Sequence, residues 1–217
     1  MTKLRVRYET IEFDSADIHV RSLRDNQQFS DDDGIAEKLG ISSASWPLFG
    51  IVWPSGSVLA HHMQSFDVAG KRVLEVGCGI GLTSLLLNHS HADITATDYH
   101  PEAANFMREN TRLNNDSDIP FFRTGWADVD AGLGLFDLIV GSDLLYESEH
   151  VELLAAFINQ HAKPLCEVIL VDPGRGNHAR FSKRMITLGY THTQAAPVSA
   201  DYLAAPFKGQ ILNYKRG

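Results

Sequence analysis

The chain of 217 residues contains only two cysteines, Cys78 and Cys166, too few for a disulfide framework. No apolar run approaches the ~20 residues of a membrane-spanning helix, and residues 1–13 lack the apolar core of a signal peptide. Lys and Arg number 19 against 27 Asp and Glu, giving a formal net charge of −8. Neutralising nucleic-acid phosphates needs clustered Lys and Arg. We therefore expect a reduced, cytoplasmic protein with no nucleic-acid or membrane partner.

Metal-ligand patterns are scarce although the chain has ten histidines. The closest pairs are His61-His62 and His89-x-His91, and neither has a Cys or a carboxylate at a ligand spacing. Adjacent helix residues also point in different directions. We therefore expect no metal site.

Hydrophobic residues make up 44% of the chain, which is enough for a full hydrophobic core. From hydrophobic periodicity, prolines and glycines we predict strands over residues 4–13, 72–76, 93–97, 119–124, 136–142, 166–171, 190–194 and 210–214. The helices are expected at about residues 56–66, 80–89, 101–113, 148–161 and 177–188. The polar segment 25–45, with its acidic run at 31–33, is predicted to be a loosely packed, solvated loop.

One stretch, V-L-E-V-G-C-G-I-G-L at 73–82, reads as a buried strand, a glycine-rich turn and the start of a helix. Gly77, Gly79 and Gly81 permit backbone conformations and close approaches that a side chain would block. A unit of this kind places free backbone N–H groups at a helix N-terminus, where a nucleotide-like ligand can bind. The alternative is a glycine turn without a ligand.

The spacing G-x-G-x-G differs from the G-x-G-x-x-G of a dinucleotide site. Glu75 precedes the first glycine by two positions and no Lys or Arg lies in the turn, which disfavours a pyrophosphate. Asp98 ends the next apolar stretch, 21 positions after Gly77, where an acidic side chain can accept hydrogen bonds from both ribose hydroxyls. We infer an adenosine with an amino-acid tail, S-adenosylmethionine, as the cofactor.

With these residues the stretch resembles motif I of the class I, seven-β-strand methyltransferases, and Asp98 matches the acidic residue after their second strand. The resemblance implies a Rossmann-like, doubly wound α/β fold with a seven-stranded sheet, mostly parallel with an antiparallel last strand. It also implies that the loop after the strand at 119–124 contacts adenine through Trp126 and Asp128. Alternatively, Trp126 simply caps the sheet edge.

Trp53 lies in a Gly- and Pro-rich loop ahead of the glycine turn, where it either packs in the core or covers the cofactor. The Trp53-Pro54 segment, and a D-x-x-Y pattern at Asp143 and Tyr146, resemble the methyltransferase-like protein-lysine N-methyltransferases. In that family this tryptophan lines the cofactor pocket, so Trp53 is assigned to cofactor binding.

The residues after the strand at 136–142 lie where ligands bind in open α/β sheets, beyond the carboxyl ends of the strands. We assign Ser142 to the cofactor site and predict Asp143 and Tyr146 as catalytic residues. Asp143 would bind and orient the acceptor ammonium, and Tyr146 would close the acceptor channel. The alternative for Asp143 is a helix N-cap.

We predict residues 1–45 to be an N-terminal extension and 46–217 to be the methyltransferase domain. The predicted activity is N-methylation of lysine side chains in a protein substrate. A small-molecule N-methyltransferase is the alternative, and a non-catalytic cofactor-binding subunit is a third. The acceptor, the number of methyl groups and the oligomeric state stay open. Residues 172–175, Asp-Pro-Gly-Arg, either contact substrate or form only a tight turn, and the turn is favoured.

Overall fold

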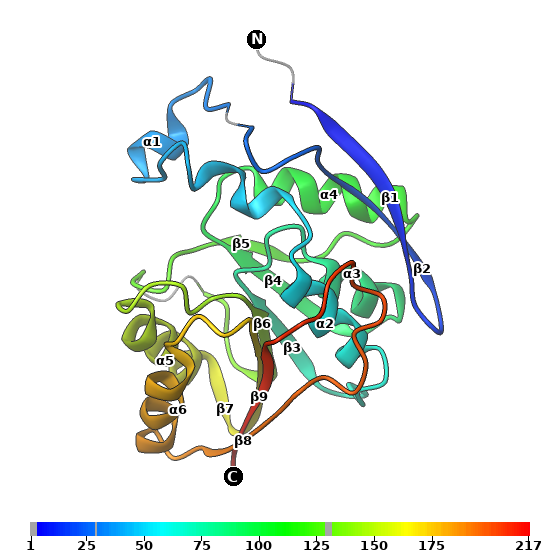
Figure 1. The fold of residues 1–217 in the computed structure, drawn as a ribbon. Helices are drawn as coiled ribbons and strands as arrows, with labels where there is room; N and C mark the ends of the chain where they lie inside the picture. The colour runs from blue at the N-terminus through cyan, green and yellow to red at the C-terminus, as the bar shows by residue number, and fades with distance from the viewer. Residues whose placement is uncertain (1–3, 29, 129–131) are drawn as a thin grey trace.

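The computed structural model describes residues 4–28, 30–128 and 132–217. Their strands form a seven-stranded sheet in the order β5-β4-β3-β6-β7-β9-β8 and a separate hairpin, β1-β2 (Figure 1). The strands are β1 Val6–Glu12, β2 Asp17–Leu23, β3 Arg72–Val76, β4 Asp93–Asp98, β5 Phe121–Arg123, β6 Phe136–Ser142, β7 Ala162–Asp172, β8 Thr191–Ala195 and β9 Gln210–Arg216. The helices are α1 Ile35–Lys38, α2 Pro54–Met63, α3 Leu82–His89, α4 Ala103–Leu113, α5 His150–His161 and α6 His178–Thr187, with a 3-10 helix at Trp46–Gly50.

The sheet confirms the predicted mostly parallel arrangement with an antiparallel last strand. Neighbouring strands from β5 to β7 run parallel, and β9 runs antiparallel to both β7 and β8. The chain builds outward from β3 through β4 to β5 and then returns to β6 on the other side of β3. In open α/β sheets, ligands bind beyond the strand ends where the strand order reverses. The glycine turn after β3 lies at this reversal.

Helices cover both faces of the sheet. Val73 of β3 belongs to the hydrophobic cluster that includes residues of α2, α3 and α4, whereas Leu74 and Val76 belong to the cluster that includes α5 and α6. Successive side chains of a strand point to opposite faces. A strand covered on both faces is therefore apolar at nearly every position. Figure 1 shows α5 and α6 on one side of the sheet, away from α2, α3 and α4.

The N-terminal segment contains a strand, β2, that was not predicted from the sequence. It pairs antiparallel with β1, from Val6 opposite Leu23 to Glu12 opposite Asp17. Two of its side chains, at positions 18 and 20, are fully buried and alternate with polar residues. This alternation was the signal that could have predicted the strand.

Two asparagines of α4 fix the hairpin on the helix. Asn110 accepts from the backbone nitrogen of Arg21 at 2.7 Å and donates to its carbonyl at 3.2 Å. Asn114 makes the same pair of bonds with the backbone of His19, both at 2.8 Å. Four residues advance about 6 Å along a helix, and two residues advance about 6.6 Å along a strand. Because these two spacings nearly match, Asn110 and Asn114 of the helix can both form hydrogen bonds with the backbone at the edge of β2.

The polar segment at 25–45 is not simply the solvated loop that the sequence predicts. Asp31 accepts hydrogen bonds from the backbone nitrogens of Ala36 at 3.0 Å and Glu37 at 2.8 Å, and Ala36 is fully buried. A carboxylate placed this way satisfies N–H groups that the start of a helix leaves free. Part of the acidic run therefore organises α1.

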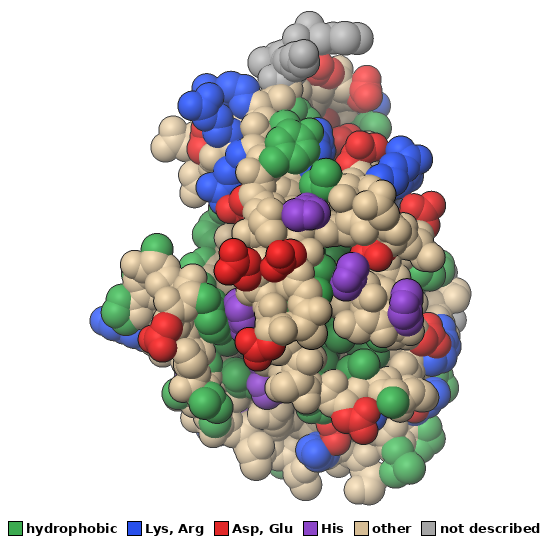
Figure 2. Space-filling view, turned by 90° about the vertical axis from the view of Figure 1, so that its right-hand side faces the viewer, with side chains coloured by type: hydrophobic (Ala, Val, Ile, Leu, Met, Phe, Trp, Pro, Cys, Tyr) green, Lys and Arg blue, Asp and Glu red, His purple; other side chains and the backbone are tan. Residues whose placement is uncertain are grey.

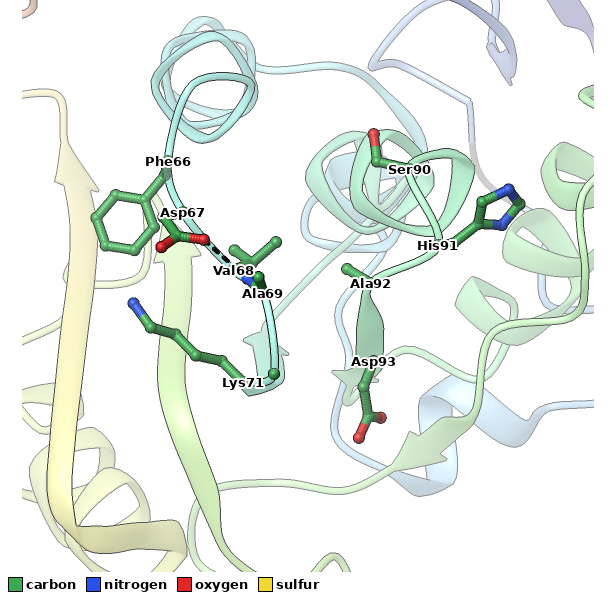
Figure 3. A pocket seen from close by; sticks show the side chains of 10 residues that line it. Phe66, Asp67, Val68, Ala69, Lys71, Ser90, His91, Ala92 and Asp93 are labelled. Carbon is green, nitrogen blue, oxygen red and sulfur yellow. Dashed lines mark hydrogen bonds between the residues drawn. The ribbon is translucent and has the colours of Figure 1, made fainter.

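The pocket drawn in Figure 3 opens at the N-terminal ends of β3 and β4, between the loops at residues 66–71 and 90–93. Its volume is about 630 Å³. Parallel strands carry their N-terminal ends at one edge of the sheet, so this pocket lies opposite the glycine turn. It contains none of the predicted site residues.

Among the described residues, no helix is long and apolar enough to cross a membrane. Within that same part of the chain, no three His, Cys, Asp or Glu side chains gather as metal ligands. Cys78 and Cys166 are free thiols. On the face shown in Figure 2, Lys and Arg lie in small separate groups among acidic and histidine side chains. That the chain does not bind nucleic acid stays a prediction.

Candidate functional site

The turn after β3 holds its three glycines in the left-handed region, with φ of 59° at Gly77, 55° at Gly79 and 72° at Gly81. A Cβ at Gly79 would lie 2.9 Å from the carbonyl oxygen of Phe49, and one at Gly77 would lie 2.6 Å from a methyl carbon of Leu144. Backbone conformation and crowding therefore both favour glycine here. The backbone at Phe49 and the loop after β6 therefore pack against the glycine turn.

Asp98 ends β4 beside this turn. Its Oδ2 accepts from the backbone nitrogen of Gly79 at 2.7 Å, and its Oδ1 accepts from that of His100 at 2.8 Å. Burial raises the pKa of Asp98, while these backbone donors lower it. Each carboxylate oxygen has more than one acceptor site, so two hydroxyl donors could still be received. The structure thus brings the predicted acidic residue and the glycine turn together.

Glu75, also predicted for the cofactor site, is directed toward the first turn of α3. Its Oε2 accepts from the backbone nitrogen of Ser84 at 2.9 Å and from the Ser84 hydroxyl. The residue is only 4% exposed, and burial raises the pKa of Glu75 to about 7 against the effect of the Ser84 bonds. Because a helix N-terminus has free N–H groups, Glu75 anchors α3. This anchoring was not predicted from the sequence.

The loop after β5 brings Trp126 to the centre of the sheet. A Cβ at Gly77 would lie 3.8 Å from Cζ2 of Trp126. The indole therefore lies beside the glycine turn at the end of β3, and its ring meets that of His150. Its contact with adenine stays a prediction. Asp128 accepts from the backbone nitrogen of Gly125 at 2.6 Å, which closes the turn that carries Trp126.

The residues after Asp98 join the site to the N-terminal segment. The Tyr99 hydroxyl donates to the carbonyl of Leu39 at 2.9 Å. The His100 ring stacks on Phe49 with ring centres 3.9 Å apart. Burial lowers the pKa of His100 to about 4, so its ring is neutral at pH 7. The two residues that follow Asp98 therefore contact Leu39 and Phe49, which precede the glycine turn in the chain. Tyr99 and His100 were not singled out from the sequence, although they directly follow Asp98.

Trp53 and Ser142 lie where the start of α2 meets the end of β6. Trp53 is half-buried, and its indole nitrogen donates to the carbonyl of Leu48 at 2.8 Å. It belongs to neither core cluster of the described residues. Pro54 begins the helix, a position that suits proline. A Cβ at Gly56 would lie 3.6 Å from the Ser142 hydroxyl oxygen.

Asp143 follows β6 with a left-handed backbone, φ 57°. Its carboxylate forms a bidentate ion pair with Arg175, with Nε to Oδ1 at 2.5 Å and Nη2 to Oδ2 at 3.0 Å. The side chain of Asp143 is 12% exposed and that of Arg175 is 43% exposed. The next helix, α5, begins at His150 with Glu149 at its N-cap. The alternative of Asp143 as a helix cap is therefore wrong.

The turn after β7 positions Arg175. Asp172 Oδ1 accepts from the backbone nitrogens of Gly174 at 2.8 Å and Arg175 at 3.3 Å. Gly174 and Gly176 have φ of 98° and 89°, which favour glycine. Residues 172–176 do form a tight turn, as the sequence favours. They also supply the partner of Asp143, which was not predicted.

Tyr146 is the remaining predicted catalytic residue. Its ring meets the His150 ring edge-on with centres 4.5 Å apart, and His150 meets Trp126 in the same way at 5.0 Å. Tyr146 is 49% exposed. Partial burial raises the pKa of its hydroxyl, and so do nearby carboxylates, including Asp98 and Asp143. The tyrosine thus lies within electrostatic reach of both the Asp98 end and the Asp143 end of the site.

Comparison with known proteins identifies relatives of this chain. A family model described as lysine methyltransferase matches residues 36–185. The electron transfer flavoprotein beta subunit lysine methyltransferase of Xenopus laevis is 30% identical over 144 residues, covering 64% of this chain and 56% of the relative. Histone-arginine methyltransferase METTL23 of Xenopus laevis is 32% identical over 108 residues, 46% of each chain. The chain thus matches about half the length of these relatives.

A solved structure with bound SAM, magnesium protoporphyrin IX methyltransferase from Synechocystis PCC 6803, has a similar fold. The TM-score is 0.58 at 20% sequence identity, covering 74% of this chain and 77% of that chain. At this identity the likeness shows the fold alone.

Proposed function

Because this chain belongs to the lysine methyltransferase family, we propose that it transfers a methyl group from S-adenosylmethionine to a lysine side chain of a protein substrate. The observation that carries the proposal is the bond between Gly79 and Asp98 at the reversal of strand order. Asp143 and Tyr146 follow the adjacent strand β6, where a methyl acceptor would approach. Two free thiols also support a cytoplasmic location.

The described side chains fit the cofactor. We assign Asp98 to the ribose hydroxyls and Trp126 and Asp128 to the adenine. Glu75 and the backbone of Gly77 and Gly79 serve the amino-acid part, together with Trp53 and Ser142. When bound, S-adenosylmethionine supplies a methyl carbon that its sulfonium charge activates toward a neutral nitrogen. In this assignment residues 46–217 carry these groups, and residues 1–45 reach the site through the bond between Leu39 and Tyr99.

The main task left to the protein is alignment of the acceptor. Well-oriented reactants can lower a barrier by up to ~7–11 kcal/mol through positioning. We assign this role to Asp143, which would bind and orient the acceptor nitrogen, and to Tyr146, which would close the channel around it. Both side chains project from a loop that follows a central, buried strand. This rigid support favours a fixed geometry.

Lysine presents a second task because it must lose a proton before it can attack. With a pKa of ~10.4, deprotonation at pH 7 costs roughly 4.6 kcal/mol. An ionised carboxylate alone stabilises the ammonium and raises that pKa. Asp143 is therefore assigned to orientation and not to base catalysis. Loss of solvent and the cofactor's positive charge favour the neutral amine.

The test is methyl transfer from radiolabelled S-adenosylmethionine into a cell extract, resolved by protein gel and followed by residue mapping. We expect discrete protein bands labelled on lysine. The Asp143→Asn variant should lose labelling at least tenfold while its cofactor affinity changes little. Asp118→Asn is the matched control. Asp118 is exposed and precedes β5, so it lies at the N-terminal ends of the parallel strands, whereas Asp143 follows the C-terminal end of β6.

Three other outcomes would contradict the proposal. Label confined to small molecules would favour the small-molecule N-methyltransferase. Label on arginine would match the activity named for the METTL23 relative. Cofactor binding without any transfer would favour a non-catalytic subunit.

A further inference from the structure

The charge around Asp143 is not that of an isolated carboxylate. Its two oxygens face Nε and Nη2 of Arg175 at 2.5 and 3.0 Å. Bidentate pairs of this kind are strong and directional. The partner comes from a turn 32 residues away in the chain, held by two backbone bonds to Asp172. The left-handed backbone of Asp143 costs conformational energy, as is common at functional sites.

This pair bears on the deprotonation problem, and the inference rests on the proposed function. A free carboxylate beside the acceptor would hold the lysine as its unreactive ammonium. A guanidinium on the same carboxylate offsets that charge. We propose that Arg175 is a resident counter-ion of Asp143 that lets the site receive the acceptor amine in its neutral form, after its proton has passed to solvent.

Arginine suits this role better than lysine would. A guanidinium remains charged throughout the range in which a lysine acceptor titrates. The hydrogen bonds that Arg175 donates to the Asp143 carboxylate raise the pKa of Arg175 further. The counter-ion therefore persists at every pH at which the enzyme would be assayed.

Other charged groups face the pair. Asp172 and Tyr146 act electrostatically on Arg175, and Glu147 acts on Tyr146. His178 lies 3.8 Å from Asp172, and His150 lies 3.6 Å from Glu147. The acceptor-specific readout is convergence of the variant with the parent at high pH, where the acceptor amine is neutral in both proteins.

The experiment measures initial methyl transfer from saturating radiolabelled S-adenosylmethionine into cell extract, from pH 6.5 to 10. The proteins compared are the full chain, Arg175→Gln, Arg175→Lys and Arg180→Gln. Arg180 is an exposed residue of α6 and serves as the matched loss of one positive charge. Cofactor affinity and melting temperature are recorded for each protein, to show that the variants are folded and bind cofactor.

For Arg175→Gln we expect the rising limb of the pH–rate profile to shift to higher pH by about one unit. This is the lower end of the pKa shift that one nearby charge produces. Its rate should fall about tenfold near pH 7.5 and converge with the parent at high pH. Arg175→Lys should keep most of the rate below pH 9, and Arg180→Gln should match the parent.

An equal loss at every pH would overturn the inference and leave Arg175 a structural residue. A faster Arg175→Gln would also overturn it, because Arg175 would then be a plug that substrate must displace. Absence of protein labelling by the parent at every pH would instead remove the proposed function, and the inference with it.

Discussion

The backbone nitrogen of Gly79 lies 2.7 Å from Oδ2 of Asp98, so the glycine turn and the end of the neighbouring strand are joined directly. The residues are 19 positions apart, and the parallel pairing of β3 with β4 brings them together. In the proposed complex the same carboxylate receives the ribose. Asp98 would then serve both the turn and the ligand.

Replacing Asp98 by Asn should weaken S-adenosylmethionine binding by roughly 10- to 100-fold, since hydrogen bonds to a charged acceptor contribute about 1.5–3 kcal/mol. Calorimetric titration measures the affinity. Asn has a single acceptor oxygen, so it keeps the bond from Gly79 or the bond from His100 but not both. The melting temperature of the variant is recorded to show that it is folded. Glu37→Gln, at an exposed position, is the control. An unchanged affinity would remove Asp98 from the ligand site.

Replacing Trp126 by Ala should weaken binding of S-adenosylhomocysteine by roughly 5- to 100-fold, because aromatic stacking on a base contributes about 1–3 kcal/mol. Trp126→Phe should recover much of the loss, since it retains an aromatic face beside Gly77. Tryptophan fluorescence during the parent's titration provides a second readout. Equal affinities for the Ala and Phe variants would contradict stacking.

Replacing Glu75 by Gln tests whether the buried carboxyl makes the stability of the fold depend on pH. The pKa of Glu75 is raised to about 7 in the fold, so the native state binds its proton more tightly than the unfolded chain does. Its contribution to stability is therefore fully present below pH ~4.5 and is lost as pH rises through ~7. The parent should lose about 2–3 kcal/mol relative to Glu75→Gln between pH 5 and pH 8. Denaturant unfolding at both pH values measures the difference, and parallel curves would contradict the assignment.

Replacing Asn110 by Ala should detach the hairpin from α4. Asn110 is fully buried, and the change leaves the backbone N–H and C=O of Arg21 without this partner in a partly buried position, at a cost of about 2–3 kcal/mol. Denaturant unfolding gives the free energy, and hydrogen exchange should show faster exchange in β2. Asn105→Ala, on the exposed face of the same helix, should change stability by less than about 0.5 kcal/mol. Equal effects of the two variants would contradict this role of Asn110.

Much of the arrangement of the candidate site could be predicted because its parts are local. A strand, a glycine turn and a helix follow one another within ten residues at 73–82, and hydrophobic periodicity with glycine spacing encodes them directly. The sheet topology brings three further residues to the C-terminal ends of the parallel strands: Asp98 ends β4, Asp143 follows β6 and Arg175 lies in the turn after β7. Strand β2 could also have been predicted, since its alternation is visible in the sequence.

By itself, the sequence determined the order of helices and strands, the mostly parallel sheet and the polar side chains that follow the C-terminal ends of its strands. Only the tertiary structure decided which partner each polar side chain takes. Arg175 pairs with Asp143, Tyr99 bonds Leu39, Asn110 holds Arg21 and Glu75 anchors Ser84. These contacts cross between elements, and their distances depend on how helices, turns and strands pack in three dimensions. Periodicity along the chain records the buried face of an element but carries no information about the side chain opposite.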